Sequence, residues 1–287
     1  MSESVAALRG RRGPRGSLAG SVATHVVLVL GAVAMVGPFV WQLLTSLKTQ
    51  TEAITAPPTL LPQRWLWSNY AEVDSALPFL QQLANSAVMA GVRTVGQLVL
   101  CSLAAYAFAR LRFPGRNLLF ALFLSVLMVP SQLLILPQYE IIVSLGLLNT
   151  LPALVLPGLF SAFGTFLLRQ FFLTIPDEIE EAALLDGAGR LRIFWSVMLP
   201  MVKPALAALA VITLMNAWND LLWPLVVNTD PSVLPISAGL TTLQGQYSTN
   251  YPVLMAGSLL ASIPMIVVYL VLQRQFVQGI ALSGSKG

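Results

Sequence analysis

Four residues that could bind a polar solute lie close together in an apolar stretch of the chain, residues 204–227. They are Asn216, Trp218, Asn219 and Asp220. Amide and carboxylate groups form hydrogen bonds with hydroxyl groups, and an aromatic face packs against the C–H-rich face of a sugar ring. Polar residues inside a membrane span are default candidates for a transport path. We therefore expect these four residues to line a path for a hydroxyl-rich solute.

The same residues also have structural interpretations. Tryptophan is enriched at membrane–water interfaces, so Trp218 suits the end of a span. The neighbouring Asn219 and Asp220 would suit the outer end of the same span. Asn216 could instead join two helices by a hydrogen bond. The sequence leaves both interpretations open.

Arg93 poses a similar question, because it lies within the apolar run 86–109. A charge inside a membrane is costly and usually faces a cavity or a partner. Alternatively, the helix starts later and Arg93 lies near the external surface.

A different kind of candidate site lies in residues 173–206. Pro176 is followed by four acidic residues, Asp177, Glu178, Glu180 and Glu181. Proline in the first turn and acids near the positive end of the dipole favour a helix N-terminus. Gly187 and Gly189 predict its end and a sharp turn. A second short helix should follow, from about residue 190 to residue 198, and end at Leu199-Pro200.

The first of these helices has small residues that would let another surface approach its backbone. Ala182, Ala183 and Gly187 are small, while Glu181 and Asp186 offer charge to a basic partner. A helix presenting anchors to a groove is a recurring recognition mode. The alternative is an amphipathic helix lying on lipid headgroups. Such helices are usually rich in Lys and Arg, and the acidic character here favours a protein partner.

Several kinds of chemistry have no candidate residues. The sequence contains no phosphate-binding loop of the form GxxxxGK[ST], so any ATPase must be another polypeptide. Its single cysteine, Cys101, and single histidine, His25, provide no metal cluster, and we expect no metal. We find no catalytic triad and expect no bound cofactor and no enzymatic activity. The Lys and Arg residues stand at the ends of apolar runs, which argues against nucleic-acid binding.

The elements that position these residues follow from the composition. Of 287 residues, 56% are hydrophobic and only 10% are charged, which is too little charge for a water-facing surface of this size. Six apolar runs approach or exceed the roughly 20 residues that cross a bilayer. They far exceed strand length, so we expect a bundle of six membrane-spanning helices. The runs are residues 22–44, 86–109, 118–144, 151–172, 204–227 and 254–272. We expect the third run to be broken by Pro130 and Pro137.

The positions of Lys and Arg predict the orientation. One set of flanks is rich in them: Arg9, Arg11, Arg12, Arg15, Arg110, Arg112, Arg116, Arg169, Arg190, Arg192, Lys203, Arg274 and Lys286. The opposite flanks have only Lys48 and Arg64. We therefore expect both termini and the loop 173–206 to be cytoplasmic.

The loop 173–206 resembles the EAA loop of ABC importer permeases. The matching residues are Glu181-Ala182-Ala183, Asp186-Gly187-Ala188, Phe194, Leu199-Pro200 and Pro204. Residues 103–116, 218–227, 251–264 and the tail from 273 also resemble MalG-type permeases of carbohydrate importers. The resemblance implies the MetI-like fold, in which the loop is a coupling helix that docks on the ATPase. Glu181, Ala182, Ala183, Asp186 and Gly187 would make this contact.

The resemblance also implies partners. They are a second, MalF-like permease, a cytoplasmic ATPase dimer that uses ATP, and an extracytoplasmic sugar-binding protein. The external loop 228–250 would contact that binding protein through Gln244, Gln246 and Tyr247. Alternatively, the loop is a solvated connector.

The expected organisation has four parts. Residues 1–20 are a disordered basic tail, 21–83 the first span and an external loop, 84–275 the permease domain, and 276–287 a cytoplasmic tail. We predict a carbohydrate importer subunit in the inner membrane. The alternatives are an ABC permease for a non-sugar solute and a secondary transporter or channel. A secondary transporter should show internal repeats and ionisable residues for ion coupling. We find no repeat, and only Arg93 and Asp220 are candidates for ion coupling.

Overall fold

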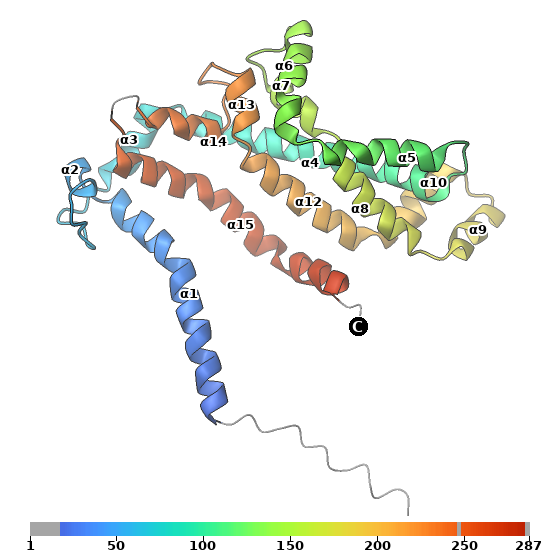
Figure 1. The fold of residues 1–287 in the computed structure, drawn as a ribbon, viewed down its shortest axis with the longest axis horizontal. Coiled ribbons are helices and arrows are strands. Elements are labelled where there is room, and N and C mark those ends of the chain that lie inside the picture. Colours follow the sequence, from blue (N-terminus) through green and yellow to red (C-terminus); the bar gives the residue numbers. More distant parts are fainter. Residues whose placement is uncertain (1–17, 246–247, 285–287) are drawn as a thin grey trace, which may run out of the picture.

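The computed structural model describes residues 18–245 and 248–284, and helices dominate this part of the chain (Figure 1). The predicted tail 1–20 lies mostly outside it. The N-terminal part has three helices: α1 (Leu18–Ser46), α2 (Gln50–Ala53) and α3 (Ser68–Ala76). The middle part comprises α4 (Phe79–Arg110), α5 (Arg116–Ser125), η2 (Val126–Met128), η3 (Ser131–Leu134), α6 (Ile135–Ser144), α7 (Leu151–Val155), η4 (Leu156–Gly158) and α8 (Ala162–Leu173).

The remaining elements begin with the loop that contains the candidate docking helix. They are α9 (Asp177–Leu185), α10 (Arg190–Ile193), a π-helical turn η5 (Phe194–Met198) and α11 (Leu199–Met201). These are followed by α12 (Lys203–Trp218), α13 (Leu222–Val227), α14 (Ile236–Gly239), η6 (Leu240–Leu243) and α15 (Tyr251–Gly284). The helix after Gly189 therefore runs through Leu199-Pro200 instead of ending there.

Three described helices are long and apolar enough to cross a membrane by themselves, over Thr24–Ser46, Phe79–Arg110 and Tyr251–Val271. Three bent helix pairs raise the number to as many as six if each pair is one span. The bends are 99° between Met128 and Ser131, 42° between Gly158 and Ala162, and 79° at Val202. The helical class is confirmed; the first, second and sixth runs lie in unbroken helices, whereas the third, fourth and fifth are interrupted.

The two prolines that were predicted to break the third apolar run have different effects on the helix. Pro130 separates η2 from η3 at the 99° bend, as a residue that cannot donate a backbone hydrogen bond should. Pro137 does not break the helix, because it lies in the first turn of α6, where a backbone N–H would have no helical partner. The break predicted at Pro137 is wrong.

The long helix α4 is the central element of the bundle, and α8 and α12 pack along it. Aromatic and aliphatic side chains fill one core region where α4 and α8 meet the segment 190–202, including Phe172, Ile193 and Phe194. A second region joins α3, α4, α12 and α15 at the opposite end. Figure 1 shows α9 at one end of the molecule and α2 at the other.

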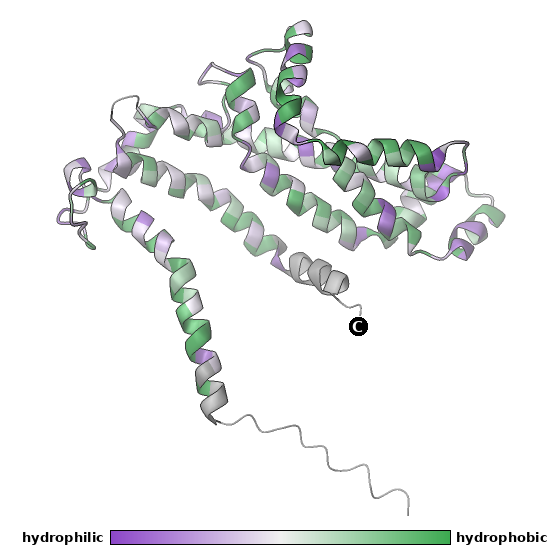
Figure 2. Cartoon of the chain, viewed as in Figure 1, coloured by the Kyte–Doolittle hydropathy of each residue, from purple (hydrophilic) through white to green (hydrophobic). Residues whose placement is uncertain are grey.

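Helix α1 diverges from the bundle, as Figure 1 shows. Side chains such as Val27, Leu30 and Met35 are exposed along its length. Only its last turns pack, where Ser46 is buried and its hydroxyl lies 2.8 Å from the Tyr70 hydroxyl. Figure 2 shows that hydrophobic residues cover α1, α5 and α15 while hydrophilic ones gather toward the ends. In a bilayer these apolar surfaces contact lipid or another membrane chain.

Candidate functional site

The loop 173–206 forms a projecting helix followed by a sharp turn. Gly187 has φ +78°. Its N–H donates to the Leu184 carbonyl, and the Ala188 N–H donates to the Ala183 carbonyl, each at 3.0 Å. This pair of hydrogen bonds is the Schellman motif that ends a helix at a left-handed residue. The helix ends at the glycine that the sequence indicated.

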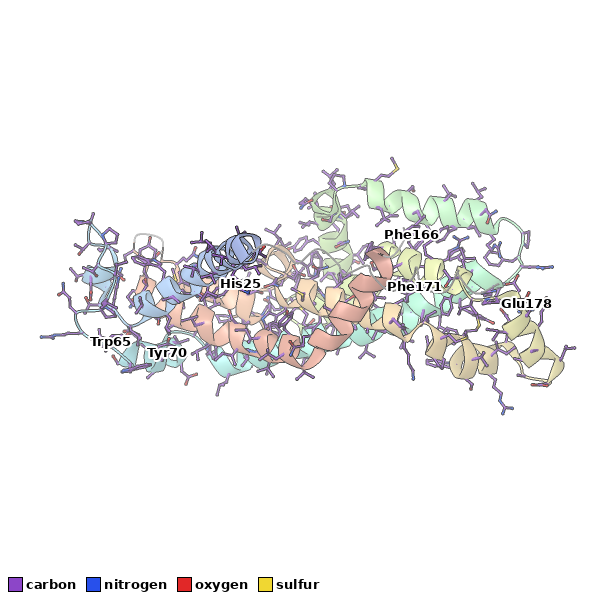
Figure 3. The ribbon with its side chains drawn as sticks, turned by 90° about the horizontal axis from the view of Figure 1, so that it is seen from below. His25, Trp65, Tyr70, Phe166, Phe171 and Glu178 are labelled. Carbon is purple, nitrogen blue, oxygen red and sulfur yellow. The ribbon has the colours of Figure 1, made fainter. Side chains whose placement is uncertain are left out.

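The predicted docking residues lie mostly on the outer side of this helix. Glu181, Ala182, Asp186 and Gly187 are exposed, whereas Ala183 is half-buried and packs on the core. Leu185 is 90% exposed, an unusual position for a large apolar side chain, and it lies next to the turn. Figure 3 shows Glu178 at this end of the molecule, and Trp65 and Tyr70 at the opposite end. The helix thus presents an acidic and apolar tip.

From the sequence, Glu180 was counted only among the acidic residues at the start of this helix. Glu180 is 7% exposed, and its carboxylate accepts hydrogen bonds from the Tyr106 hydroxyl at 2.9 Å and from Arg190 at 3.1 Å. Tyr106 belongs to α4, so this contact fixes α9 to the central helix. In the sequence, the only sign of this contact on α4 was a tyrosine near the end of an apolar run, and such a tyrosine is not a specific signal.

Arg110 is a second connection between α4 and the loop. Its guanidinium donates to the Asp177 carboxylate and to the backbone carbonyls of Phe172 and Ile175. The Arg110 side chain is only 5% exposed. Sequence reasoning counted Arg110 as an orientation signal, but it also holds the start of α9 against α4.

The four predicted path residues fall into two separate places. Asn216 and Asp220, four residues apart, line a polar cavity of about 280 Å³. Trp218 and Asn219 line a different, largely apolar cavity of about 460 Å³ between α12, α14 and α15. Asn216 lies in α12, Trp218 is the last residue of that helix, and Asp220 lies in the break that follows it. Trp218 and Asn219 therefore line a different cavity from Asn216 and Asp220, and a role of these four residues in a solute path stays a prediction.

The polar cavity also explains Arg93. Its guanidinium forms a 2.7 Å ion pair with Asp220 and donates to the Leu154 carbonyl. Because α4 begins at Phe79, Arg93 is well inside the helix, and the interpretation that placed it near the surface is wrong. Gln97 also lines the cavity. Its side-chain amide donates to the Gly158 carbonyl at 2.9 Å, and its side-chain oxygen accepts from the Thr213 hydroxyl at 2.8 Å.

The external loop is anchored at several points. Buried polar side chains near the start of α4 hold its first part: Asn85 donates to the Ser232 and Leu234 carbonyls, and Ser86 accepts from the Ile236 N–H. At the start of the loop, the Ser232 N–H and hydroxyl both donate hydrogen bonds to the Asp230 carboxylate. These hydrogen bonds lower the pKa of the Asp230 carboxyl. Most of the loop is therefore packed and not a solvated connector.

The loop ends in a narrow hairpin with a single antiparallel bridge between Gln244 and Thr249. Gln50, the first residue of α2, supports its base by donating to the Thr249 carbonyl at 2.6 Å and accepting from the Tyr251 N–H at 3.0 Å. Gln244 is exposed. The predicted contact residues Gln246 and Tyr247 lie outside the described residues.

No group of three or more potential metal ligands occurs among the described residues. Residues 97–281 match the family model of the binding-protein-dependent transport system inner membrane component. The sn-glycerol-3-phosphate transport system permease protein UgpE of Yersinia pestis bv. Antiqua (strain Antiqua) is 39% identical over 89% of this chain and 94% of its own. UgpE of Pectobacterium atrosepticum is 38% identical over 90% and 94%.

The fold has a counterpart among solved structures. A chain from the crystal structure of a bacterial ABC transporter involved in the import of the acidic polysaccharide alginate superposes with a TM-score of 0.79. It shares 24% identity, and the match covers 91% of this chain and 98% of that one. These relatives are transport components and not enzymes. The chain is a multi-pass membrane protein that belongs to the family of binding-protein-dependent transport system inner membrane components.

Proposed function

We propose that this chain is the permease subunit of an ABC importer for a carbohydrate-type solute, with separate ATPase subunits coupled to it through α9. The observation that carries the proposal is the projecting α9 with its turn at Gly187. This helix presents exposed small, apolar and acidic residues, yet its base is fixed to α4 through Glu180 and Arg110. Movement of a partner bound to the tip would therefore be passed to the bundle.

In this proposal both termini and the α9 end are cytoplasmic, and the α2 end is external. Each of the six spans is a long helix or a broken pair, and residues 84–275 form the permease domain. Residues 1–20 and 276–287 are its cytoplasmic tails. The apolar sides of α5 and α6 face a second, MalF-like permease or lipid. The hairpin around Gln244, with Gln246 and Tyr247, contacts an extracytoplasmic solute-binding protein.

The transport cycle then has a mechanical basis. ATP binding closes the ATPase pair, and Glu181, Ala182, Ala183, Asp186 and Gly187 carry this motion into α9. Helix α4 runs from Tyr106 and Arg110, which hold α9, to Arg93 in the polar cavity. The 79° break at Val202 allows α12 to turn relative to the loop. The bundle opens outward, receives solute from the binding protein and releases it inward after hydrolysis.

The solute class is proposed on two grounds. The UgpE relatives carry the name of a sn-glycerol-3-phosphate transport system, a phosphorylated polyol. The polar cavity places carboxylate, amide and hydroxyl groups inside the bundle, as a solute rich in hydroxyl groups requires. A non-sugar solute remains a second candidate only if the cavity proves not to bind hydroxyl-rich molecules.

The coupling role is tested by Gly187→Leu. A Cβ atom at this position meets open space, with nothing beyond its two chain neighbours within 4 Å, so the fold has room for the start of a larger side chain here. The positive φ adds about 1 kcal/mol of backbone strain. We expect solute transport to be lost and ATP hydrolysis by the assembled complex to become independent of the binding protein, while membrane insertion is unchanged.

Gly115→Leu is the matched control. Gly115 has φ +75°, a Cβ there also meets nothing within 4 Å, and it lies in the neighbouring loop. The two variants have the same strain, and only the first adds bulk at the docking tip. Normal coupling in Gly187→Leu, or equal loss in both variants, would contradict the coupling role of α9.

A further inference from the structure

The polar cavity is charge-balanced, which bears on the kind of solute it can accept. Of the described residues lining it, Arg93 and Asp220 alone are charged, and they form an ion pair with each other. The net charge of the lining is therefore zero. A buried pair of this kind leaves no excess positive charge for an anionic solute.

The two charges are not equally accessible. The Asp220 side chain is 22% exposed, compared with 8% for Arg93. Arg93 is also held from behind by the Leu154 carbonyl and packs closely on Gly158, where a Cβ would lie 2.5 Å from its Cδ and Nε atoms. Of the two charged groups, the carboxylate is therefore the more accessible to a solute in the cavity. A phosphate group would be repelled at this point.

The cavity nevertheless has free hydrogen-bonding groups. The ion pair uses Oδ2 of Asp220, and within the described residues Oδ1 has no hydrogen bond. Asn216 is exposed one helical turn away, and its amide likewise has no partner in the described part of the chain. A carboxylate oxygen and an amide, spaced along one face, suit adjacent hydroxyl groups of a sugar or polyol.

We infer that this cavity is a subsite for an uncharged, hydroxyl-rich solute, and that it excludes phosphorylated solutes. The inference rests on the proposed function and makes it more specific: the relatives are named for a phosphorylated polyol, whereas the lining of this chain selects against the phosphate. Asp220 and Asn216 bind hydroxyl groups directly. Arg93 is a positioning residue that fixes the Asp220 carboxylate.

Protection of a cysteine reporter tests the inference. Ile212 lines the cavity and is 39% exposed, and Cys101 is the single native cysteine and is buried. In a Cys101→Ala background, Ile212→Cys is assembled with the partner subunits in lipid nanodiscs and alkylated with a small maleimide. Glucose and glucose 6-phosphate are compared because they differ only in the phosphate. We expect glucose to slow alkylation several-fold and glucose 6-phosphate to leave its rate unchanged.

Two variants at Asn216 test the two parts of the inference. The residue is exposed and unbonded in the described structure, so neither substitution removes an internal contact. Asn216→Ala should abolish protection by glucose, because the amide is lost. Asn216→Lys makes the net charge of the cavity positive and should allow glucose 6-phosphate to protect. Leu60→Cys, which is 72% exposed and is not among the residues that line this cavity, should be protected in no case.

Three results would overturn the inference. They are equal or better protection by glucose 6-phosphate in the unaltered cavity, no protection by either compound, and unchanged protection in both Asn216 variants. The Gly187→Leu measurement of ATPase coupling does not involve this cavity. If the cysteine-protection test failed, the coupling role of α9 would be unaffected. If the coupling test failed, the inference about the cavity would be unaffected.

Discussion

At the residue scale, the connection between α9 and α4 depends on buried polar contacts and not on the exposed residues of the sequence motif. Glu180 and Arg110 lie inside the junction between α9 and α4, whereas Glu181 is exposed beside them. A buried carboxylate needs hydrogen-bond partners, and Glu180 has two, Tyr106 and Arg190. In the proposed coupling role, transmission of force from the tip depends on these buried residues as well as on the exposed ones.

Tyr106→Phe isolates one of these contacts. It removes a buried hydroxyl that donates to a carboxylate, a bond worth about 1.5–3 kcal/mol. We expect the free energy of unfolding, measured by denaturant titration in detergent micelles, to fall by about 2 kcal/mol. We also expect more ATP to be hydrolysed per solute transported, because α9 is held less firmly.

The control for this variant is Tyr251→Phe. Tyr251 is exposed, and in the described structure its ring hydroxyl makes no hydrogen bond. A surface change of this kind should alter stability by less than about 0.5 kcal/mol. Equal effects of the two variants would mean that the contact between Tyr106 and Glu180 does not strengthen the junction.

The sequence predicted the exposed part of the candidate site better than the buried part. The turn at Gly187 and the acidic start of α9 follow from local rules about helix ends, so they could be read directly. The pairing of Arg93 with Asp220 joins positions 127 residues apart, and no local rule reports such a contact. The sequence also could not show that Trp218 lines a different cavity from Asn216, because spacing along one helix does not tell which neighbour each side faces.

At the scale of elements, the main feature is that three of the six apolar runs are interrupted by bends. Composition predicted the apolar runs well because hydrophobic length is a local property. Composition did not predict the bends, apart from the one at Pro130, because the direction in which each helix runs is set by its packing against other helices. The break between α12 and α13 coincides with Asn219, Asp220 and Leu221, so the polar residues lie where the helix ends.

Gly158→Ala tests the close packing of one break against α4. Its Cβ would lie 2.5 Å from two side-chain atoms of Arg93, which its hydrogen bonds hold in place. Overpacking of this kind costs about 1–3 kcal/mol, and we expect stability in detergent to fall by that amount.

The matched variant is Gly91→Ala, within α4. A Cβ there meets nothing within 4 Å, so the gain in helix propensity should stabilise the protein by about 0.5–1 kcal/mol. A neutral Gly158→Ala would show that Arg93 can move, and that the ion pair is not fixed by this contact.

At the scale of the whole molecule, the two ends differ in their basic residues and in the elements that they expose. The α9 end has the arginines, including Arg112 and Arg190, and the projecting helix. The α2 end has the packed external loop and its hairpin. The excess of Lys and Arg is the basis for the proposal that the first end is cytoplasmic.

Cysteine accessibility checks this orientation. In the Cys101→Ala background, Leu60→Cys marks the α2 end and Leu185→Cys the α9 end, and both positions are strongly exposed. A membrane-impermeant maleimide applied to intact spheroplasts should label the Leu60→Cys variant. It should label the Leu185→Cys variant only after the membrane is permeabilised, and the opposite pattern would reverse the orientation.

The divergence of α1 has a consequence for how the protein is made. Helix α1 leaves the ribosome before the other described helices, and it needs almost no contact with them until its last turns pack. It can therefore insert and remain stable in the bilayer while the bundle is still being synthesised. A copy that finds no second subunit would keep this bare helix in lipid, and such an uncovered segment is what a membrane protease could recognise when it removes unassembled chains.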